Sequence, residues 1–341
     1  MTAQYKNINL KNKKVLITGA DGFIGSHLVE ALLNEGSDIR AMAMYNSFNN
    51  WGWLDHLDKK TLQKIEVYPG DMRDKKSVDN ACKDIDIVFH LASLIAIPQS
   101  YYSPYAYLET NATGALNLLE SCLDSKVEKI IHTSTSEVYG EYDSVPISES
   151  NKNIARSPYS ATKIAADQLA YSYFSTFDLP ISIIRPFNTY GPRQSNRAII
   201  PTIITQILNN THIELGSLYP TRDFTYIDDT VLGFISIAKN KHSIGEIINI
   251  GSGYEISIDD LVQLIQTIMK TNLKIKISSN RKRPIKGEVF RLKANVNKAK
   301  KLLNWQPSFK GKKGLIEGLK ETIDWFSNEE NLQFYKSSIY N

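Results

Sequence analysis

The chain has 341 residues, of which 42% are hydrophobic and 22% are charged, and its formal net charge is +4. Its scattered lysines form no basic stripe interleaved with aromatic residues, which argues against a nucleic-acid binder. The N-terminal segment lacks an apolar signal core, no apolar run reaches the ~20 residues of a membrane span, and the two cysteines are too few for a disulfide framework. We therefore expect a cytoplasmic protein with no nucleic-acid or membrane partner and no metal site.

Short apolar runs alternate with longer helix-period segments through the first half of the chain. The runs cover residues 14–18, 39–44, 64–68, 85–91, 129–133 and 181–184. Parallel strands need long crossover connections, and continuous rather than alternating apolarity indicates strands that are buried on both faces. The sequence therefore predicts an α/β protein with a doubly wound parallel sheet of the Rossmann type.

The first predicted strand runs directly into a glycine-rich turn and then a helix. The turn reads Gly19-Ala20-Asp21-Gly22-Phe23-Ile24-Gly25. In a dinucleotide site, such glycines allow a tight turn, a close approach of the backbone to the pyrophosphate and close packing of helix on strand. A purely structural turn is the alternative. The position after the first strand of a βαβ unit favours dinucleotide binding.

The second predicted strand ends without the acidic residue that commonly binds the adenosine ribose of NAD. Its end reads Met44-Tyr45-Asn46-Ser47. No Lys or Arg lies between Arg40 and Lys59 to receive the extra phosphate of NADP, so we expect NAD, with Asn46 or Ser47 as ribose contacts. Asp71 and Met72 follow the third strand. There Asp71 is either a partner of the adenine amine or an exposed loop residue.

The strand at 129–133 ends in small hydroxyl side chains followed by a carboxylate. The run reads Thr133-Ser134-Thr135-Ser136-Glu137. Ser, Thr and Gly are common where a strand breaks into a turn, so a plain strand end is one interpretation. Ligands of doubly wound sheets bind at the carboxyl ends of the strands. Thr135, Ser136 and Glu137 are therefore candidate catalytic residues.

Tyr159 and Lys163 lie four residues apart at the start of a helical pattern that runs to about Phe174. This spacing places both side chains on one face of the helix. An ammonium group beside a phenol favours the phenolate and would lower the pKa of Tyr159 from ~10 towards neutrality. We therefore predict that Tyr159 acts as a base on a hydroxyl of the substrate.

The pattern of elements changes after Asn188, where prolines separate shorter segments. We expect residues 1–189 to form an NAD-binding Rossmann domain, which a helix and a strand within about 226–265 join again. Residues 190–225 and 266–341 are expected to form a smaller C-terminal α/β lobe that binds the substrate.

In combination, these features resemble the extended short-chain dehydrogenase/reductase family. The resemblance continues through HLAS at 90–93, TNATG at 110–114, RPFNTYGP at 185–192, RDFTYIDD at 222–229 and NWQP at 304–307. It thus covers nearly the whole chain. It implies bound NAD, contacted also by Leu91 and Ala92, a nucleotide-diphosphate sugar as substrate, and a homo-oligomer, either dimer or tetramer.

Within this family, the triplet Thr-Ser-Glu resembles that of the sugar-nucleotide 4,6-dehydratases, especially the GDP-mannose enzymes. The resemblance implies that Tyr159 takes the proton of the carbon 4 hydroxyl while hydride passes to NAD. Lys163 then holds the nicotinamide ribose, and Thr135 hydrogen-bonds the same substrate oxygen. Glu137 removes the carbon 5 proton, water leaves carbon 6, and hydride returns there. Ser136 stands where the dTDP-glucose enzymes have Asp, so either Ser136 or Glu137 protonates the leaving water.

The same resemblance indicates a substrate site and a substrate. The site residues that it implies are Asn188, Arg197, Arg222, Arg283 and Glu288. The stretch YNSFNNWGWLDHL at 45–57 is similar to that of the GDP-N-acetylglucosamine 4,6-dehydratases of bacterial legionaminic acid synthesis. The role of its two tryptophans, Trp51 and Trp53, stays open, because such residues most often pack in a core or an interface.

Two other reactions of nucleotide sugars are alternatives. UDP-glucuronate decarboxylases share the Thr-Ser-Glu triplet, but they usually read Tyr-Asp-Glu-Gly-Lys where this chain has YSATK at 159–163. A sugar-nucleotide 4-epimerase usually has small residues at the positions of Ser136 and Glu137. A catalytically silent NAD-binding sensor is more remote, because it should have lost Tyr159, Lys163 or Glu137.

Overall fold

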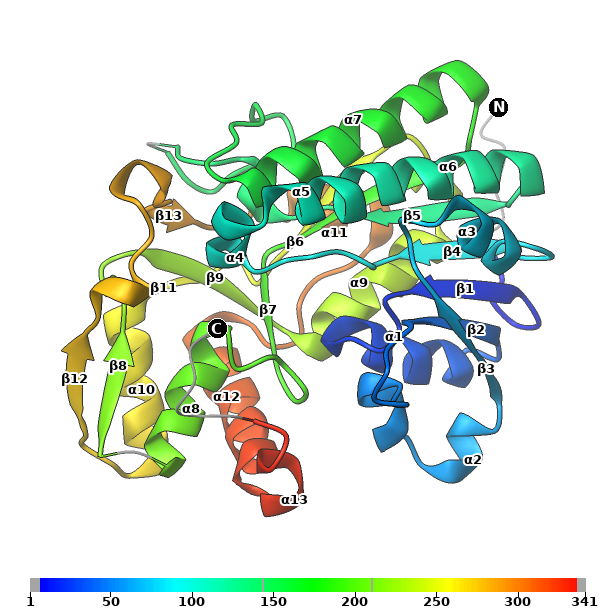
Figure 1. Cartoon of the computed structure of the whole chain (residues 1–341). Helices are drawn as coiled ribbons and strands as arrows, with labels where there is room; N and C mark the ends of the chain where they lie inside the picture. The colour runs from blue at the N-terminus through cyan, green and yellow to red at the C-terminus, as the bar shows by residue number, and fades with distance from the viewer. Residues whose placement is uncertain (1–6, 143, 210, 336–341) are drawn as a thin grey trace.

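Seven parallel strands form the central sheet of the computed structural model, which describes residues 7–142, 144–209 and 211–335. The strands are β1 (Lys14–Thr18), β2 (Asp38–Met44), β3 (Ile65–Gly70), β4 (Ile87–His90), β5 (Lys129–Thr133), β6 (Ile181–Pro186) and β10 (Ile247–Ile250). Their order is β10-β6-β5-β4-β1-β2-β3, so the direction of winding reverses between β1 and β4. The predicted doubly wound parallel sheet is therefore confirmed (Figure 1).

Both faces of this sheet are buried, as the continuous apolar runs predicted. Along β1, Val15 and Ile17 pack into one hydrophobic cluster and Leu16 into another on the opposite face. Helices α1 (Phe23–Asn34) and α9 (Ile227–Lys239) pack together in the first cluster. Helices α3 (Lys75–Ala81), α6 (Gly114–Ser125) and α7 (Pro158–Phe177) cover the other face (Figure 1).

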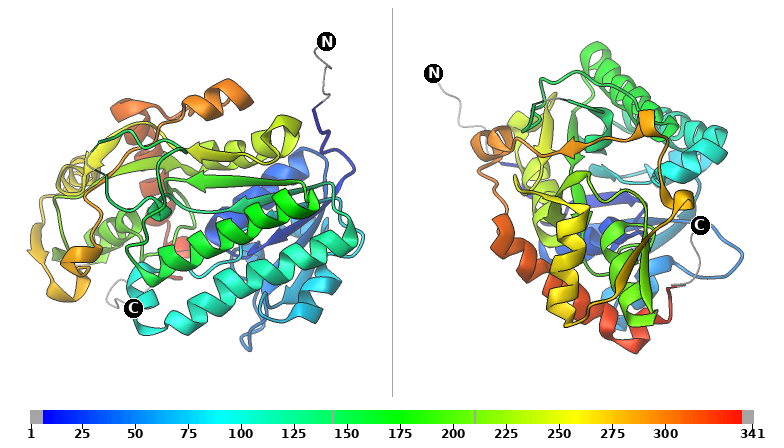
Figure 2. Two further views of the ribbon diagram at one scale, coloured as in Figure 1. Left: turned by 90° about the horizontal axis from the view of Figure 1, so that it is seen from above. Right: turned by 90° about the vertical axis from the view of Figure 1, so that its left-hand side faces the viewer.

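A second group of strands lies beyond the carboxyl ends of the central sheet. In it, β9 (Thr221–Tyr226) pairs with β7 (Asn188–Tyr190), β11 (Glu255–Ser257) and β13 (Arg291–Leu292), and β8 (His212–Leu215) pairs with β12 (Lys274–Ile277). Helices α8 (Ile199–Asn209), α10 (Ile258–Met269) and α12 (Gly311–Ser327) pack around these strands. Figure 2 shows this group at one end of the blue-to-green sheet.

The chain passes between the two groups of strands more than once. It leaves the central sheet after β6, returns through α9 and β10, and leaves again for β11. The assignment of each group to cofactor or substrate stays a prediction. Within the predicted return segment 226–265, α9 and β10 belong to the central sheet, whereas β11 and α10 lie with the second group.

The remaining helices are short. They are α2 (Lys59–Leu62), α4 (Ile97–Tyr102), α5 (Pro104–Tyr107), α11 (Asn297–Leu303) and α13 (Glu329–Leu332). Tight helical turns cover Gly52–His56, Leu108–Thr113, Ser136–Val138, Lys241–Ser243, Ser279–Arg281 and Ile285–Gly287. Within the part of the chain that the structure describes, every helix is too short or too polar to cross a membrane.

Candidate active site

A cavity of about 1530 Å³ opens between the carboxyl ends of the central strands and the second group of strands. It exceeds the ~300–1,000 Å³ of a typical small-molecule site, so it has room for two large ligands. All predicted site residues except the two candidate ribose contacts, Asn46 and Ser47, line it. The predicted residues that line it are Gly19, Asp21, Gly22, Phe23, Ile24, Gly25, Asp71, Met72, Leu91, Ala92, Thr135, Ser136, Glu137, Tyr159, Lys163, Asn188, Arg197, Arg222, Arg283 and Glu288.

The glycine turn has no room for side chains at its two ends. Gly19 has φ +70°, and a Cβ there would lie 2.8 Å from the backbone nitrogen of Ala92. A Cβ on Gly25 would lie 2.1 Å from the carbonyl oxygen of Gly19. The turn therefore brings the N-terminus of α1 directly to the wall of the cavity, where backbone N–H groups and the helix dipole favour a pyrophosphate. The residues present thus fit the dinucleotide predicted from the sequence.

We expect Gly25→Ala to lower the free energy of unfolding by about 1–3 kcal/mol or more, because the new methyl group overlaps backbone that cannot move aside. Thermal unfolding followed by circular dichroism measures this loss. Gly22→Ala is the matched control, since its Cβ would lie 3.3 Å from the same Gly19 oxygen. A Gly25→Ala protein that unfolds at the temperature of Gly22→Ala would contradict this account of the turn.

The cavity lining differs from the expected set at the adenosine end. Asn46 does not line the cavity, because its amide donates to the carbonyl oxygen of Asn50 at 2.8 Å and its own oxygen accepts from Phe48 N. Asn50 lines the cavity instead. Burial raises the pKa of Asp21, whose carboxylate accepts a hydrogen bond from the backbone N–H of Met44 at 3.3 Å. Asp21 thus links the glycine turn to the end of β2.

Arg73 also lines the cavity, outside the stretch between Arg40 and Lys59 that lacks basic residues. Its guanidinium forms a forked contact with Asp71, with Nε 3.0 Å from Oδ1 and Nη2 2.6 Å from Oδ2. This contact holds the pKa of the Asp71 carboxyl below its usual range. The contact thus fixes both side chains at this end of the cavity.

The Thr-Ser-Glu triplet forms a tight turn directly after β5. Thr135 Oγ1 accepts a hydrogen bond from the backbone N–H of Glu137 at 3.2 Å, which fixes the turn and faces all three residues toward the cavity. Ser136 is 3% exposed and Glu137 is 8% exposed. A carboxylate that is this buried needs a partner, and Arg283 Nη1 lies 3.6 Å from Glu137 Oε1.

Tyr159 and Lys163 come from the first turns of α7, which begins with a capping box between Ser157 and Ser160. Lys163 Nζ donates to the carbonyl oxygen of Thr133, the last residue of β5, at 2.6 Å. Burial lowers the pKa of Lys163 to about 8, against the charge of Asp167, which raises it. The lysine is therefore held at the strand end beside the triplet.

The predicted pKa of Tyr159 is wrong for the protein without ligands. Burial raises the pKa of the phenol well above its ordinary value, although a hydrogen bond with Thr135 lowers it, and the charge of Glu137 raises it further. The ammonium group of Lys163 does not offset this, because it is turned to the Thr133 carbonyl. Tyr159 is thus a phenol until a ligand adds positive charge or a hydrogen bond.

A buried network of charged and polar side chains lies next to Lys163 and the end of β5. Asp167, one turn after Lys163 on α7, accepts from Arg185 Nη2 at 2.8 Å and from Ser134 Oγ at 2.7 Å, and His132 Nε2 lies 3.3 Å away. Burial opposes the charge of Asp167, but the contacts with His132 and Arg185 hold its pKa below the ordinary value. The network ties α7 to β5 and β6.

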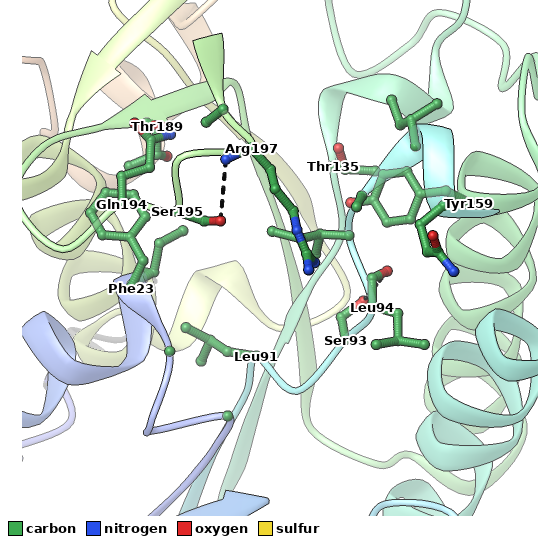
Figure 3. A pocket seen from close by; sticks show the side chains of 18 of the residues that line it. Phe23, Leu91, Ser93, Leu94, Thr135, Tyr159, Thr189, Gln194, Ser195 and Arg197 are labelled. Atoms are coloured by element: carbon green, nitrogen blue, oxygen red, sulfur yellow. Dashed lines mark hydrogen bonds between the residues drawn. The ribbon is translucent and has the colours of Figure 1, made fainter. Parts of the chain in front are cut away.

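The opposite wall carries the predicted arginines. Arg222 is 6% exposed and lies 3.3 Å from Glu288, and Arg283 Nη1 lies 3.9 Å from the same carboxylate. Figure 3 shows the side chain of Arg197 extending into the cavity, between Phe23 and Leu91 on one side and Thr135 and Tyr159 on the other. Permanently charged, planar groups at this wall suit a diphosphate.

Several lining residues escaped the sequence interpretation. They include Arg73, Tyr107, Arg193, Trp53, His56 and Phe334. Arg193 Nη1 donates to Glu30 Oε2 on α1 at 2.6 Å, and Phe334 lies near the end of the described chain. The sequence alone gives no signal for contacts such as Arg193 with Glu30, because these partners lie far apart along the chain.

Residues 16–317 match the family model described as GDP-mannose 4,6 dehydratase. The chain belongs to this family. The UDP-glucuronate 4-epimerase of Thermodesulfobacterium geofontis is 34% identical over 332 residues, which cover 94% of this chain and 98% of that protein. The UDP-N-acetyl-alpha-D-glucosaminuronate decarboxylase of Bacillus cytotoxicus is 33% identical over 331 residues, or 94% of this chain and 99% of that protein.

This chain is also similar to solved structures, and one of them is a sugar-nucleotide dehydratase. The structure of DesIV, a dTDP-glucose 4,6-dehydratase from Streptomyces venezuelae with NAD bound, matches with a TM-score of 0.83 at 26% identity. The match covers 95% of this chain and 99% of DesIV. The extended short-chain dehydrogenase/reductase fold is thus confirmed, and NAD in DesIV agrees with the predicted cofactor. The relatives include a dehydratase, an epimerase and a decarboxylase of sugar nucleotides.

Proposed function

We propose that the protein is an NAD-dependent sugar-nucleotide 4,6-dehydratase. The observation that carries this proposal is the buried carboxylate of Glu137 in the same cavity wall as Tyr159 and Thr135. Oxidation and reduction at a single carbon need one proton acceptor, for which Tyr159 suffices. Elimination of water from the neighbouring carbons needs a second acid–base group, and Glu137 is available for that role.

The cofactor would lie along the glycine turn, with its adenosine end between Asp71 and Asn50 and its nicotinamide end near Lys163. NAD would supply the acceptor for the hydride of carbon 4 and return that hydride to carbon 6. The lack of any Lys or Arg between Arg40 and Lys59, in the segment after β2, supports NAD over NADP. The NAD bound to DesIV supports it as well.

The side chains divide the proton transfers between them. Once bound ligands lower its pKa, Tyr159 ionises, and its phenolate takes the proton of the carbon 4 hydroxyl while Thr135 Oγ1 holds that oxygen. Lys163 would hold the nicotinamide ribose, and the new ketone at carbon 4 then makes the proton at carbon 5 acidic. Glu137 takes that proton and passes it to the carbon 6 hydroxyl, which leaves as water positioned by Ser136. When hydride returns to carbon 6, Glu137, protonated again from solvent, would give a proton to carbon 5. A hydroxyl is a poor acid, so Ser136 orients this water.

For the substrate we propose GDP-N-acetylglucosamine, and for the role a step in legionaminic acid synthesis. The likeness of residues 45–57 to the enzymes of that pathway supports this, as does the match to the GDP-mannose 4,6 dehydratase model. Asn188 and the arginines Arg197, Arg222 and Arg283 would hold the diphosphate, and Glu288 the nucleoside. We also propose a homo-oligomer, which the exposed Tyr171 and Phe177 on α7 support.

Incubation with separate sugar nucleotides, followed by mass spectrometry of the products, tests this function. We expect GDP-N-acetylglucosamine to give a product lighter by one water, with solvent deuterium at carbon 5. A product of unchanged mass would identify a 4-epimerase, and loss of carbon dioxide from a uronic acid would identify a decarboxylase. Water loss from another sugar nucleotide would keep the reaction and correct only the substrate.

A further inference from the structure

The tryptophan-rich loop after β2 meets the last described residues of the chain. Trp53 packs on Trp325 of α12, on Phe334 and on Tyr335, with ring centroids 5.5, 6.1 and 6.0 Å apart. His56 lies with its ring 4.4 Å from that of Phe334. We call Trp53, His56, Trp325, Phe334 and Tyr335 the aromatic cluster. It joins two segments that lie almost 300 residues apart in the sequence.

The loop side of the aromatic cluster rests on the glycine turn. Trp53 N donates to the carbonyl oxygen of Asp21 at 3.0 Å. Gly52 has φ +56°, and a Cβ there would lie 2.6 Å from the same oxygen, so the turn Gly52–His56 lies directly against it. Leu54, which is fully buried in the first hydrophobic cluster, anchors this turn in the core. Whatever fixes Trp53 therefore also fixes the loop over the proposed pyrophosphate site.

The C-terminal side of the aromatic cluster is part of the cavity wall. Phe334 lines the cavity together with Trp53 and His56, although its side chain is 52% exposed. The Tyr335 ring stacks on Trp53 and packs 4.8 Å from the ring of Phe326, a buried residue of α12. The Tyr335 hydroxyl is buried, and no hydrogen-bond partner for it occurs among the described residues. Its ring, and not its hydroxyl, therefore holds this residue in place.

We propose that the C-terminal segment is a component of the cofactor site. Through Phe334 and Tyr335 it locks the loop onto the glycine turn and slows the release of NAD. This inference rests on the NAD binding of the proposed function. It fits the proposed chemistry, because hydride returns to the same sugar and the cofactor needs no exchange between turnovers.

The release of NADH from loaded protein, chased with excess NAD and followed by fluorescence, tests this role. In Phe334→Ala/Tyr335→Ala we expect release about tenfold faster than in wild type, which corresponds to about 1.4 kcal/mol. Trp53→Ala should accelerate release to a similar extent. Combining Trp53→Ala with the double variant should add little more, because all three changes remove the same contact.

Two further variants separate loss of the contact from a general loss of structure. Tyr335→Phe keeps the ring and removes only the unpartnered hydroxyl, so release should stay slow. His56→Ala removes one exposed ring that touches Phe334, so it should fold normally and accelerate release by a smaller factor. Leu232→Ala, an exposed apolar side chain on α9 remote from the cavity lining, should behave as wild type.

The outcomes distinguish this inference from the cofactor assignment itself. Release at the wild-type rate in folded His56→Ala, Trp53→Ala and Phe334→Ala/Tyr335→Ala, each judged by circular dichroism, would overturn the role of the C-terminal segment and leave the NAD assignment intact. Effects of Trp53→Ala and the double variant that simply add would also overturn it. Wild-type protein that binds neither NADH nor NAD would overturn the proposed cofactor, and this inference with it.

Discussion

Tyr159→Phe is expected to lower turnover by about 10²–10⁴-fold, because it removes the proposed base for the carbon 4 proton. The side chain is fixed on the first turn of α7, and its hydroxyl bonds with Thr135 at the strand end. Phenylalanine keeps the ring in its buried position, so the fold should stay intact. Rapid mixing of the enzyme with the sugar nucleotide, followed by absorbance at the NADH band, measures the oxidation step directly.

Tyr107→Phe is the matched control for this substitution. The Tyr107 ring lies 6.3 Å from the ring of Tyr159, but its hydroxyl donates to the carbonyl oxygen of Ala96 at 2.5 Å and is not free to take a proton. The loss in Tyr107→Phe should therefore be far smaller. Equal losses in the two variants, or a Tyr159→Phe enzyme with nearly wild-type turnover, would assign the base to another group.

Glu137→Gln is expected to stop the reaction after oxidation and to lower overall turnover by about 10²–10⁴-fold. The glutamine keeps the shape of the side chain but cannot take the carbon 5 proton. The negative charge of Glu137 raises the pKa of Tyr159, so its removal makes the phenol easier to ionise and should not hinder the first step. In a single turnover, NADH and an undehydrated 4-keto sugar should accumulate, without deuterium from solvent at carbon 5.

Glu288→Gln separates the elimination step from simple loss of charge in the cavity. Glu288 also lies beside Arg283, but it pairs with Arg222 on the proposed nucleotide side. This substitution should raise KM and leave deuterium exchange at carbon 5 in place. If Glu137→Gln still released a dehydrated product at the wild-type rate, Glu137 would not be the base for elimination.

The central sheet was predictable because its inner strands, such as β4 and β6, are buried on both faces. Such strands must be apolar without interruption, and runs like those at 129–133 and 181–184 stand out from their polar flanks. The glycine turn was predictable for a related reason, since only glycine fits where Gly25 faces the carbonyl oxygen of Gly19. Both features can be read from a short stretch of sequence, because burial restricts the residue types in a strand and close backbone contact restricts those in the turn.

Other parts of the site depend on contacts that one sequence does not display. Asn46 and Asn50 are chemically alike, and only the folded loop shows that the first bonds to the backbone of the second. Burial raises the pKa of Tyr159. The spacing of Tyr159 and Lys163 in the sequence shows neither how deeply the phenol is buried nor that the Lys163 ammonium donates to the Thr133 carbonyl. The aromatic cluster likewise forms only in the folded chain, because Trp53 and its partners Trp325 and Phe334 are distant in the sequence.

The passage of the chain between its two groups of strands bears on how such enzymes diversify. Neither group is encoded by one continuous stretch, because α9 and β10 return to the central sheet between β9 and β11. A single recombination event therefore cannot exchange one group of strands for another, as it can for tandem domains joined by one linker. New specificities must arise by substitutions and by replacement of short segments within a shared framework. Relatives that differ in reaction yet align over almost their whole length, such as the epimerase and the decarboxylase, agree with that history.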